Sequence, residues 1–492
     1  MKKLSPPYLF SITIVVFGLF GYWSLNQNGL AFPLDDAWIH QAYARNLAQN
    51  FEWAFISGQP SAGGTSFLWV LLLAIGYLLN VAPALWSTIL GFVLVLACMK
   101  LAIHFQKEFS KNHIFPLWLI PIAVLLEWHL LWAAYSGMET LLLAVLVLLL
   151  MTRLKQIETS SEFSFQTWLL NALILGAAIA TRPDAITLFG PIGLFLVFSK
   201  LGQIRKLIAG LALILVPMLV NLPFALLNLQ NSGSLLPSTF YAKQAEYSIL
   251  LENSLLMRWG NMGAQVIMGI GVLLIPGFVY LIWTEIAKRR LVLPLFSTWI
   301  LGYITLFAVR LPLAYQHGRY MIPVIPIFLV IGLLGSYALF ERFIKAHQEF
   351  VSKHVFQGII LAVLCVYAVL GSQGLNNDVV FIEAQMSATA NWVEKNLPQR
   401  SRIAAHDIGA IGYFAEPQLS DLAGLVSPEV IPFIRDEDLL KAYMNKNNVE
   451  FFITFPDWYP SLSANLAILY QAPSFTVGNE QVEGMSVYIW KE

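Results

Sequence analysis

Long apolar runs recur along most of this chain, and they constrain its fold more than any other feature. We count about twelve of them, at 8–25, 65–79, 84–105, 114–133, 138–152, 167–181, 185–199, 207–228, 264–284, 291–309, 319–340 and 355–371. Because a helix of about 20 apolar residues crosses the ~30 Å hydrocarbon core of a bilayer, the runs predict a polytopic membrane protein. Only 12% of the residues are charged, against roughly 25% in soluble domains. The formal net charge is zero, so nothing in the overall charge favours nucleic acid as a partner.

Clusters of lysine and arginine orient the runs. They lie at 107–111, 153–155, 200–206, 288–290 and 342–353. The positive-inside rule places them in the cytoplasm, and we interpret the first run as an uncleaved span that starts there. The chain then crosses the membrane only once between Asp35 and the first cluster, although two runs lie in that stretch. The shorter run, 65–79, is therefore expected to be re-entrant or juxtamembrane, which leaves about eleven spans.

The composition changes near residue 372. The segment 372–492 has no long apolar run, and 382–396 reads as an amphipathic helix ended by Pro398. The segments 402–406, 451–455 and 486–490 read as short strands. The predicted fold is an all-α polytopic membrane domain over 1–371, followed by a small α/β domain over 372–492. Parity of the spans places the second domain outside the cytoplasm.

Carboxylates stand at unusual places in the first domain. Up to residue 371 the only aspartates are Asp35, Asp36 and Asp184, and all three fall at predicted outer ends of spans. Charged groups near hydrocarbon are costly and often functional. Adjacent carboxylates raise the pKa of one of them unless a cation compensates, which suits a general base or a ligand of a divalent metal ion such as Mg²⁺ or Mn²⁺. The plainer alternatives are solvated loop residues, or Asp36 as the N-cap of a helix over 37–50.

Other polar side chains converge on the same predicted face and are candidates for binding an anionic lipid head group. They are Tyr43, Arg45, Glu139, Arg182, Asp184, Tyr241, Lys243, His317, Arg319 and Tyr320. Arginine suits phosphate through its planar fork, although arginine at a span end also snorkels by default. Arg182 and Asp184 could equally pair with each other, and Tyr43 and Arg45 could be interfacial anchors. The sequence has no Walker-type or G-x-G-x-x-G pattern, so it gives ATP-driven and nicotinamide chemistry no support.

Several segments, in order, resemble GT-C membrane glycosyltransferases, and most closely the cell-wall arabinofuranosyltransferases that use a polyprenyl-phosphate arabinose donor. The opening segments are 34–38 (LDDAW), 43–48 (YARNLA), 58–60 (GQP) and 64–69 (GTSFLW). The later segments are 136–140 (SGMET), 181–184 (TRPD), 236–243 (LPSTFYAK), 318–320 (GRY) and 406–414 (HDIGAIGYF). The resemblance implies juxtamembrane helices in the first outer loop, a lipid-phosphate-sugar donor and an inverting transfer to an acceptor outside the cytoplasm.

The expected mechanism starts with the acidic pair. Asp35 or Asp36 deprotonates an acceptor hydroxyl on a glycan, lipid or protein, and a polyprenyl phosphate leaves. Arg319, Arg182 and Lys243 are the candidates for stabilising the charge of the leaving phosphate. In the outer domain, Asp407, Tyr413 and Asp421 are candidates for positioning the acceptor, with ordinary turn and strand roles as the alternative. The rival functions are a transporter or flippase of lipid-linked glycans and a non-catalytic scaffold that binds them.

Overall fold

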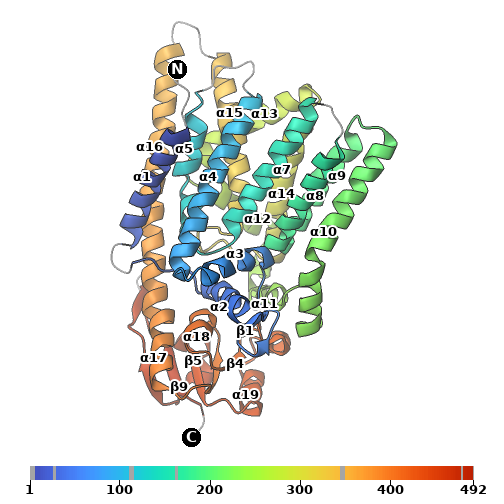
Figure 1. Cartoon of the computed structure of the whole chain (residues 1–492). Coiled ribbons are helices and arrows are strands. Elements are labelled where there is room, and N and C mark those ends of the chain that lie inside the picture. Colours follow the sequence, from blue (N-terminus) through green and yellow to red (C-terminus); the bar gives the residue numbers. More distant parts are fainter. Residues whose placement is uncertain are drawn as a thin grey trace.

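The computed structural model describes residues 6–25, 29–109, 116–160, 164–343, 349–477 and 480–490. Helices form a long bundle, and a smaller region with strands lies at one end of it (Figure 1). The N-terminal end of the first helix lies at the opposite end of the bundle from this region. The start of the chain at Met1 and parts of two basic clusters, at 110–111 and 344–348, lie outside the described residues.

Six helices in the described ranges are long and apolar enough to cross a membrane. They are α4 (Pro83–Phe109), α7 (Thr140–Ser160), α10 (Gln203–Ser232), α14 (Val292–Arg310), η4 with α15 (Ile322–Phe343) and α16 with its extension (Lys353–Asn396). The pair α12 (Leu255–Ile267) and α13 (Gly271–Ala287), bent by 95°, would make a seventh. The chain is therefore mostly helical and polytopic, but the expectation of about eleven spans is not confirmed.

The difference arises because several apolar runs form shorter helices. These are α1 over its described core (Tyr8–Tyr22), α3 (Phe67–Leu78), α8 (Phe165–Thr181) and η2 with α9 (Pro183–Phe198). The run 114–133 is divided at Glu127 into α5 (Leu119–Leu126) and α6 (Trp128–Tyr135). The Glu127 backbone is extended, and its carboxylate accepts the N–H of Leu130, which caps α6. A polar cap inside an apolar run thus ends one helix and starts another.

The first loop of the bundle forms the floor that positions the candidate site. Helix α2 (Asp35–Asn50) and helix α3 pack together and lie across the ends of the long helices (Figure 1). A hairpin of β1 (Ala54–Ile56) and β2 (Gln59–Pro60) connects them, so the first domain is not purely helical. The plainer alternative considered from sequence, that Asp36 is the N-cap of α2, is wrong. The helix begins at Asp35, its N-cap residue is Leu34, and no side chain caps it.

One helix joins the bundle to the C-terminal region. Helix α16 (Glu349–Ile382) continues through a π-helical turn (Glu383–Ser387) into α17 (Ala388–Asn396). The helix expected at 382–396 is therefore the end of a continuous helix, and the boundary expected between residues 371 and 372 falls inside it. Its end beside Pro398 agrees with the sequence, because proline does not continue a helix.

The C-terminal region contains a mixed five-stranded sheet. Its order is β4 (Gln418–Asp421), β3 (Arg402–Ala405), β5 (Phe451–Thr454), β9 (Ser486–Ile489) and β6 (Ile468–Gln471). The first three strands are parallel, and β9 is antiparallel to both β5 and β6. The three strands predicted from sequence are β3, β5 and β9, each within a residue of its expected end. The remaining elements are α11 (Ser238–Glu246), η3 (Ser248–Glu252), α18 (Gly409–Phe414), η7 (Pro428–Phe433), α19 (Glu437–Lys446), η8 (Pro456–Trp458), α20 (Pro460–Ser463), β7 (Phe475–Val477) and β8 (Glu480–Val482).

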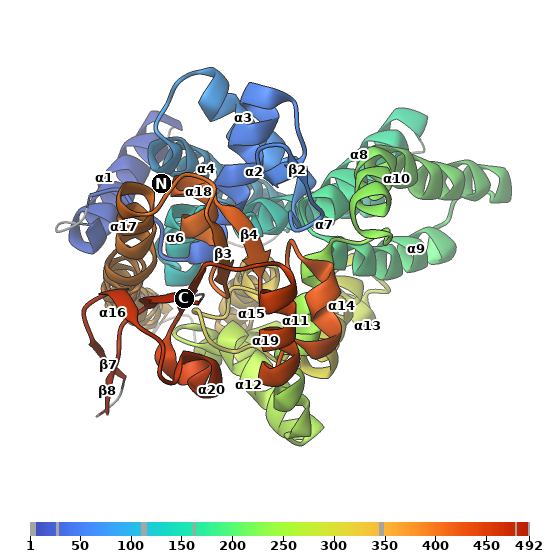
Figure 2. The same cartoon turned by 90° about the horizontal axis from the view of Figure 1, so that it is seen from below.

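Helix α18 holds this region against the first loop. The ring of Trp38 in α2 packs on Tyr413 of α18 at 4.7 Å between centroids, and Arg45 donates a 2.8 Å hydrogen bond to the Tyr413 carbonyl. Seen along the bundle, strands β3 and β4 lie near its centre and β7 and β8 at one edge, while α8, α9 and α10 extend to the other side (Figure 2). The C-terminal region therefore covers one part of the bundle end, the part that includes α2.

Candidate functional site

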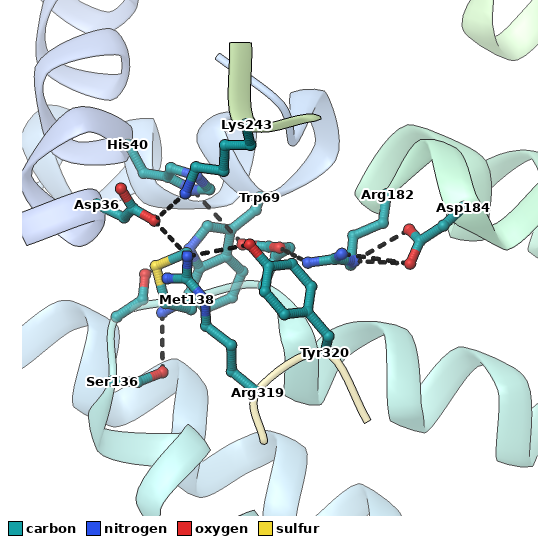
Figure 3. Close-up of polar contacts among 12 residues, drawn as sticks. Asp36, His40, Trp69, Ser136, Met138, Arg182, Asp184, Lys243, Arg319 and Tyr320 are labelled. Carbon is teal, nitrogen blue, oxygen red and sulfur yellow. Dashed lines mark hydrogen bonds and ion pairs between the residues drawn. The ribbon is translucent and has the colours of Figure 1, made fainter. Parts of the chain in front are cut away.

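The centre of the candidate site is the Asp36 carboxylate, held between two cations that come from distant parts of the chain (Figure 3). Lys243 Nζ of α11 lies 2.7 Å from Asp36 Oδ2, and Arg319 Nη2, just before η4, lies 2.7 Å from the same oxygen. The Arg319 side chain is 4% exposed and the Asp36 side chain 25%. We call these three residues the Asp36 cluster.

The cluster keeps Asp36 ionised. Burial by itself would raise the pKa of Asp36, but the charges of Lys243 and Arg319, together with their hydrogen bonds, outweigh burial and hold this pKa well below its usual value. Asp36 is thus a carboxylate with two cationic partners.

Asp35 faces a different direction. Its Oδ2 accepts the N–H of Gly409 at 2.7 Å and its Oδ1 accepts the N–H of Ala410 at 2.8 Å, both at the start of α18. A Cβ at Gly409 would collide with the Asp35 carbonyl oxygen and lie 2.8 Å from Oδ1, so this contact requires glycine. Burial and the nearby Asp407 charge raise the pKa of Asp35 to about 7, against the lowering effect of the two N–H donors.

The sequence suggested that the two carboxylates hold a divalent metal ion, but in the structure they bind different partners. Within the described residues, no group of three or more His, Cys, Asp and Glu side chains is arranged to hold a metal ion. The donor chemistry agrees, because Asp36 already contacts two cations that would repel a third. The oxygens of Asp35 accept backbone N–H groups instead. The residues present do not fit an Mg²⁺ or Mn²⁺ ion bound between Asp35 and Asp36.

A second group of charged residues adjoins the Asp36 cluster. Arg182 Nη1 donates to Glu139 Oε1 at 2.7 Å, and Arg182 Nε donates to Asp184 Oδ1 at 3.0 Å (Figure 3). The Arg182–Asp184 pairing considered from sequence is thus present, with Glu139 as a further partner. Tyr320 contacts both groups. Its hydroxyl accepts a 3.2 Å hydrogen bond from Arg319 Nη2, and the Arg182 guanidinium lies 5.3 Å from its ring centroid.

Two cavities meet at the Asp36 cluster, whose three residues line both. The first is the more polar of the two, and we call it the polar cavity; it has a volume of about 750 Å³ and reaches His406 and Asp407 of the C-terminal region. The second, which we call the apolar cavity, has a volume of about 330 Å³ and is walled by side chains such as Phe240 and Phe307, with Arg182 at its polar end. This arrangement can hold an amphiphilic anion on one side of Asp36 and a polar molecule on the other.

Four residues predicted for the site line neither cavity: Tyr43, Arg45, Tyr241 and His317. The Tyr43 hydroxyl is buried and bonds to Ser61 Oγ at 2.7 Å, which organises the loop before α3. Arg45 binds α18, as described above, and Tyr241 is 39% exposed with its ring against Phe240.

His317 lies behind the site. Its Nε2 is 2.8 Å from Asp378 Oδ2 of α16, and its ring packs near Trp128 and Trp132. Residues Gln316, His317 and Gly318 all have positive φ, so the backbone just before Arg319 adopts a conformation that costs energy at the two non-glycine positions. The contacts of His317 stabilise the segment that presents Arg319 to Asp36.

Sequence reasoning missed two residues that lie beside those it found. His40 is buried, with Nδ1 3.9 Å from Glu139 Oε2, and it stands four residues after Asp36 on α2. Glu246 lines the polar cavity and binds His406 Nε2 at 3.0 Å, and it stands three residues after Lys243 on α11. Because side chains three and four residues apart share a helix face, this spacing was the signal that would have found them.

The residues proposed for the outer domain separate in the structure. Asp407 lines the polar cavity, and its Oδ2 is buried without a hydrogen-bond partner. The carboxylate of Asp421 accepts the N–H groups of Ala423 and Val426, an ordinary turn role. Tyr413 packs on α2 instead. Of the three, only Asp407 adjoins the site.

Comparison with known proteins shows which solved structures share this fold. A family model described as "Domain of unknown function (DUF8728)" matches residues 378–488, a minority of the chain. None of the curated proteins matches the sequence. Among solved structures, ArnT from Cupriavidus metallidurans, bound to undecaprenyl phosphate, superposes with a TM-score of 0.61 at 13% identity, over 97% of each chain.

Two further kinds of enzyme share the architecture. The archaeal oligosaccharyltransferase AglB from Archaeoglobus fulgidus, in complex with an inhibitory peptide and a dolichol-phosphate, has a TM-score of 0.61 at 10% identity, over 93% of this chain and 70% of that one. Another structure of the A. fulgidus oligosaccharyltransferase is a complex with Zn and sulfate. The arabinofuranosyltransferase AftD from Mycobacteria has a TM-score of 0.51 at 12% identity, over all of this chain and 40% of that one. All are GT-C glycosyltransferases, so the predicted GT-C resemblance is confirmed at the level of the fold.

Proposed function

We propose that this protein is an integral-membrane glycosyltransferase. It moves a sugar from a polyprenyl-phosphate donor to a glycan, lipid or protein acceptor outside the cytoplasm, with inversion at the anomeric carbon. The observation that carries the proposal is the position of the Asp36 cluster, where a cavity with apolar walls meets a larger polar one. The shared fold agrees with this, since the ArnT and AglB structures hold undecaprenyl phosphate and a dolichol-phosphate.

Arg319 is the residue best suited to the donor phosphate. Its Nη2 contacts Asp36 and donates to Tyr320, but its Nε and Nη1 are buried and have no hydrogen-bond partner. Unsatisfied buried donors cost about 1–3 kcal/mol each, and more when the group is charged. Neither atom is open to a cavity in this structure, so the side chain must turn before a phosphate beside Arg319 and Lys243 can satisfy these donors through charge-assisted hydrogen bonds. The apolar walls near Phe240 and Phe307 would then receive the first isoprene units of the donor.

Asp36 is the proposed base. It lines both cavities, whereas Asp35 lines only the polar one and already accepts a backbone N–H at each oxygen. A bound phosphate dilutes the positive charge that Lys243 and Arg319 exert on Asp36, and its own negative charge adds to this effect. Both changes make Asp36 a stronger base when donor is present. Base strength is thus coupled to donor binding.

The chemical step then balances without a covalent enzyme intermediate. The acceptor hydroxyl gives its proton to Asp36 while its oxygen forms a bond to the anomeric carbon. The bond from that carbon to the phosphate oxygen breaks on the opposite face of the sugar. The polyprenyl phosphate leaves with the electron pair, and Arg319 and Lys243 stabilise the added charge.

Transfer of radiolabelled sugar from polyprenyl-phosphate donors by the purified full chain tests the proposal. We expect Asp36→Asn to lower the rate by roughly two to four orders of magnitude, the usual contribution of a general base. Asp438→Asn, an exposed carboxylate of α19, is the control. A flippase or scaffold would keep its function in Asp36→Asn and would show no transfer in the wild type.

The same assay separates the two aspartates. The pKa of Asp35 is raised to about 7, chiefly by burial and by Asp407. If Asp35 were the base, the wild-type rate would fall as pH drops below about 7, and Asp35→Asn would abolish transfer. That result, together with a near-normal transfer rate in Asp36→Asn, would refute the assignment of Asp36 as the base.

A further inference from the structure

We propose that the polar cavity is the acceptor site and that the acceptor it takes is a carbohydrate without acidic groups. The inference rests on the proposed function, because it names the second substrate of the same site. Charge, an unsatisfied oxygen and aromatic walls carry it, and each is independent of the others.

The first observation is the charge of the cavity wall. Seven carboxylate residues line the polar cavity, against three lysine and arginine residues: Asp35, Asp36, Glu246, Asp378, Asp407, Glu437 and Asp457, against Lys243, Arg319 and Arg435. Two of the three cations are engaged with Asp36, and the third, Arg435, donates to the Glu246 carbonyl oxygen. His406 adds a further cation to the wall, since its hydrogen bond to Glu246 raises its pKa against the effect of burial, and the pKa values of Asp35 and Asp407 are raised to about 7 and about 6. Carboxylates still outnumber cations over the rest of the wall, which disfavours a uronate, sulfate or phosphate on an acceptor.

The apolar cavity lacks this acidic excess, because apart from the Asp36 cluster, which lines both cavities, its wall holds two arginines and two carboxylates. Four lysine and arginine residues line it, against three carboxylates: Arg182, Lys243, Arg310 and Arg319, against Asp36, Glu139 and Asp184. An anionic donor and a non-acidic acceptor would each meet a wall of suitable charge. The acidic residues of the polar cavity thus disfavour an acidic acceptor there, while Lys243 and Arg319 line both cavities.

The second observation is a carboxylate oxygen that has no donor. Asp407 Oδ2 is buried without a hydrogen-bond partner, although Asp407 lines the polar cavity. Burial and the neighbouring charges of Glu246 and Asp36 raise its pKa to about 6, against the lowering effect of His406. Asp407 therefore has unused capacity to accept a hydrogen bond beside the cavity, and a sugar hydroxyl is a neutral donor of the kind that matches it.

The third observation is the aromatic content of the same wall. Trp458 and Tyr315 line the cavity and are 49% and 47% exposed, so their faces are open to a ligand. Trp458 is held in place by Phe455, with ring centroids 5.0 Å apart, and by His406 at the same distance. An aromatic face offers apolar area to the C–H face of a sugar ring, while carboxylates nearby take its hydroxyls. A cavity with both features fits a carbohydrate better than a lipid tail.

Binding of oligosaccharides to the full chain in detergent, without donor, tests the inference. The probes are tetrasaccharides of glucose, galactose, mannose and arabinose, with uronic-acid tetrasaccharides of the first three as the acidic counterparts. Saturation-transfer-difference NMR detects such weak complexes and gives their dissociation constants. We expect at least one neutral probe to bind, and to bind about tenfold or more tightly than its acidic counterpart.

Two variants locate the binding. Trp458→Ala removes the open aromatic face and should weaken the neutral probe about tenfold, which corresponds to roughly 1.4 kcal/mol. Trp283→Ala is the matched control, because Trp283 is 59% exposed on α13 and lines neither cavity. The inference is overturned if acidic probes bind as tightly as neutral ones, if no neutral probe binds, or if Trp458→Ala binds like the wild type.

The outcome is separable from that of the proposed function. Oligosaccharide binding is measured without donor, so it does not depend on the transfer step. Binding by a protein that transfers no sugar from any donor would refute the glycosyltransferase proposal and leave the site standing. Efficient transfer to a uronate acceptor would refute the acceptor class and leave the glycosyltransferase standing.

Discussion

Arg319 offers the sharpest test of the chemistry, because two substitutions remove different properties of its guanidinium. Arg319→Lys keeps the positive charge but loses the planar fork, including the unpartnered Nε and Nη1 that we assign to the donor phosphate. Arg319→Met keeps much of the side-chain volume and loses the charge as well. Losing donors that stabilise developing charge costs about 10²- to 10³-fold in rate. We expect Arg319→Lys to fall in that range and Arg319→Met to fall further.

The pH profile distinguishes the two variants further. Arg319 and Lys243 hold the pKa of Asp36 well below its usual value, against the raising effect of burial. Two unit charges about 4 Å apart interact by about 4 kcal/mol at an effective dielectric constant of 20, and one pKa unit is about 1.4 kcal/mol. Removing the Arg319 charge should therefore raise the pKa of Asp36 by roughly one to three units. The acidic limb of kcat/KM in the wild type therefore lies below the usual range of a carboxylate. It should move up toward that range in Arg319→Met and stay in place in Arg319→Lys.

Single-turnover and steady-state transfer across acidic and neutral pH measure both effects. Arg258→Lys is the control, since Arg258 binds the Ala308 carbonyl and lines neither cavity. Normal transfer by Arg319→Lys would refute the assignment of the free N–H groups to the donor. An unmoved acidic limb in Arg319→Met would refute Asp36 as the base, because the titrating group would then lie out of reach of the Arg319 charge.

Two more predictions concern the contact at Asp35 and the orientation of the chain. Gly409→Ala places a methyl group against the Asp35 backbone, and overpacking of this kind typically costs about 1–3 kcal/mol. It should lower both the melting temperature and the transfer rate. Gly302→Ala is the control, because no atom lies within 4 Å of its added Cβ, and it should lower neither. For orientation, a cysteine at the exposed position Arg400 should react with an impermeant thiol reagent from outside the cell, and one at Gln203 only after the membrane is opened. Both variants are made with Cys98 and Cys365 replaced, and labelling of Arg400→Cys from the cytoplasm alone would reverse the proposed topology.

The sequence predicted much of the site because chemistry-bearing residues are rare in this chain. Asp36, Lys243 and Arg319 stand out against apolar surroundings, and the positive-inside rule by itself assigned all three to one face of the membrane. Asp36 and Lys243 are 207 residues apart in the chain, and Arg319 is farther from Asp36 still, so no local pattern encodes their mutual contact. The resemblance to GT-C enzymes supplied the missing constraint, since it placed the segments around one site.

The number of spans was less predictable, for a physical reason. Hydropathy reports how apolar a run is, but it does not show where the helix breaks. Glu127 divides one run by capping a new helix, and Pro183 starts a 3₁₀ turn between two short helices. Hydropathy also does not show where a helix continues. The apolar run 355–371 and the amphipathic segment after it form one helix from Lys353 to Asn396. Breaks depend on capping and packing partners, which only the folded chain supplies.

The different roles of Asp35 and Asp36 follow from the start of α2. Adjacent residues on a helix point about 100° apart, so two neighbouring carboxylates in the first turn do not share one partner. Asp36 faces the bundle, where Lys243 and Arg319 approach it, and Asp35 faces α18 of the C-terminal region. Asp36, which we propose as the base, therefore directly follows Asp35, which binds the C-terminal wall of the polar cavity. A shift of α18 would move Asp35 first, and through the same helical turn it would move Asp36 relative to its cations. Docking of the C-terminal region is therefore part of what sets the geometry of the base.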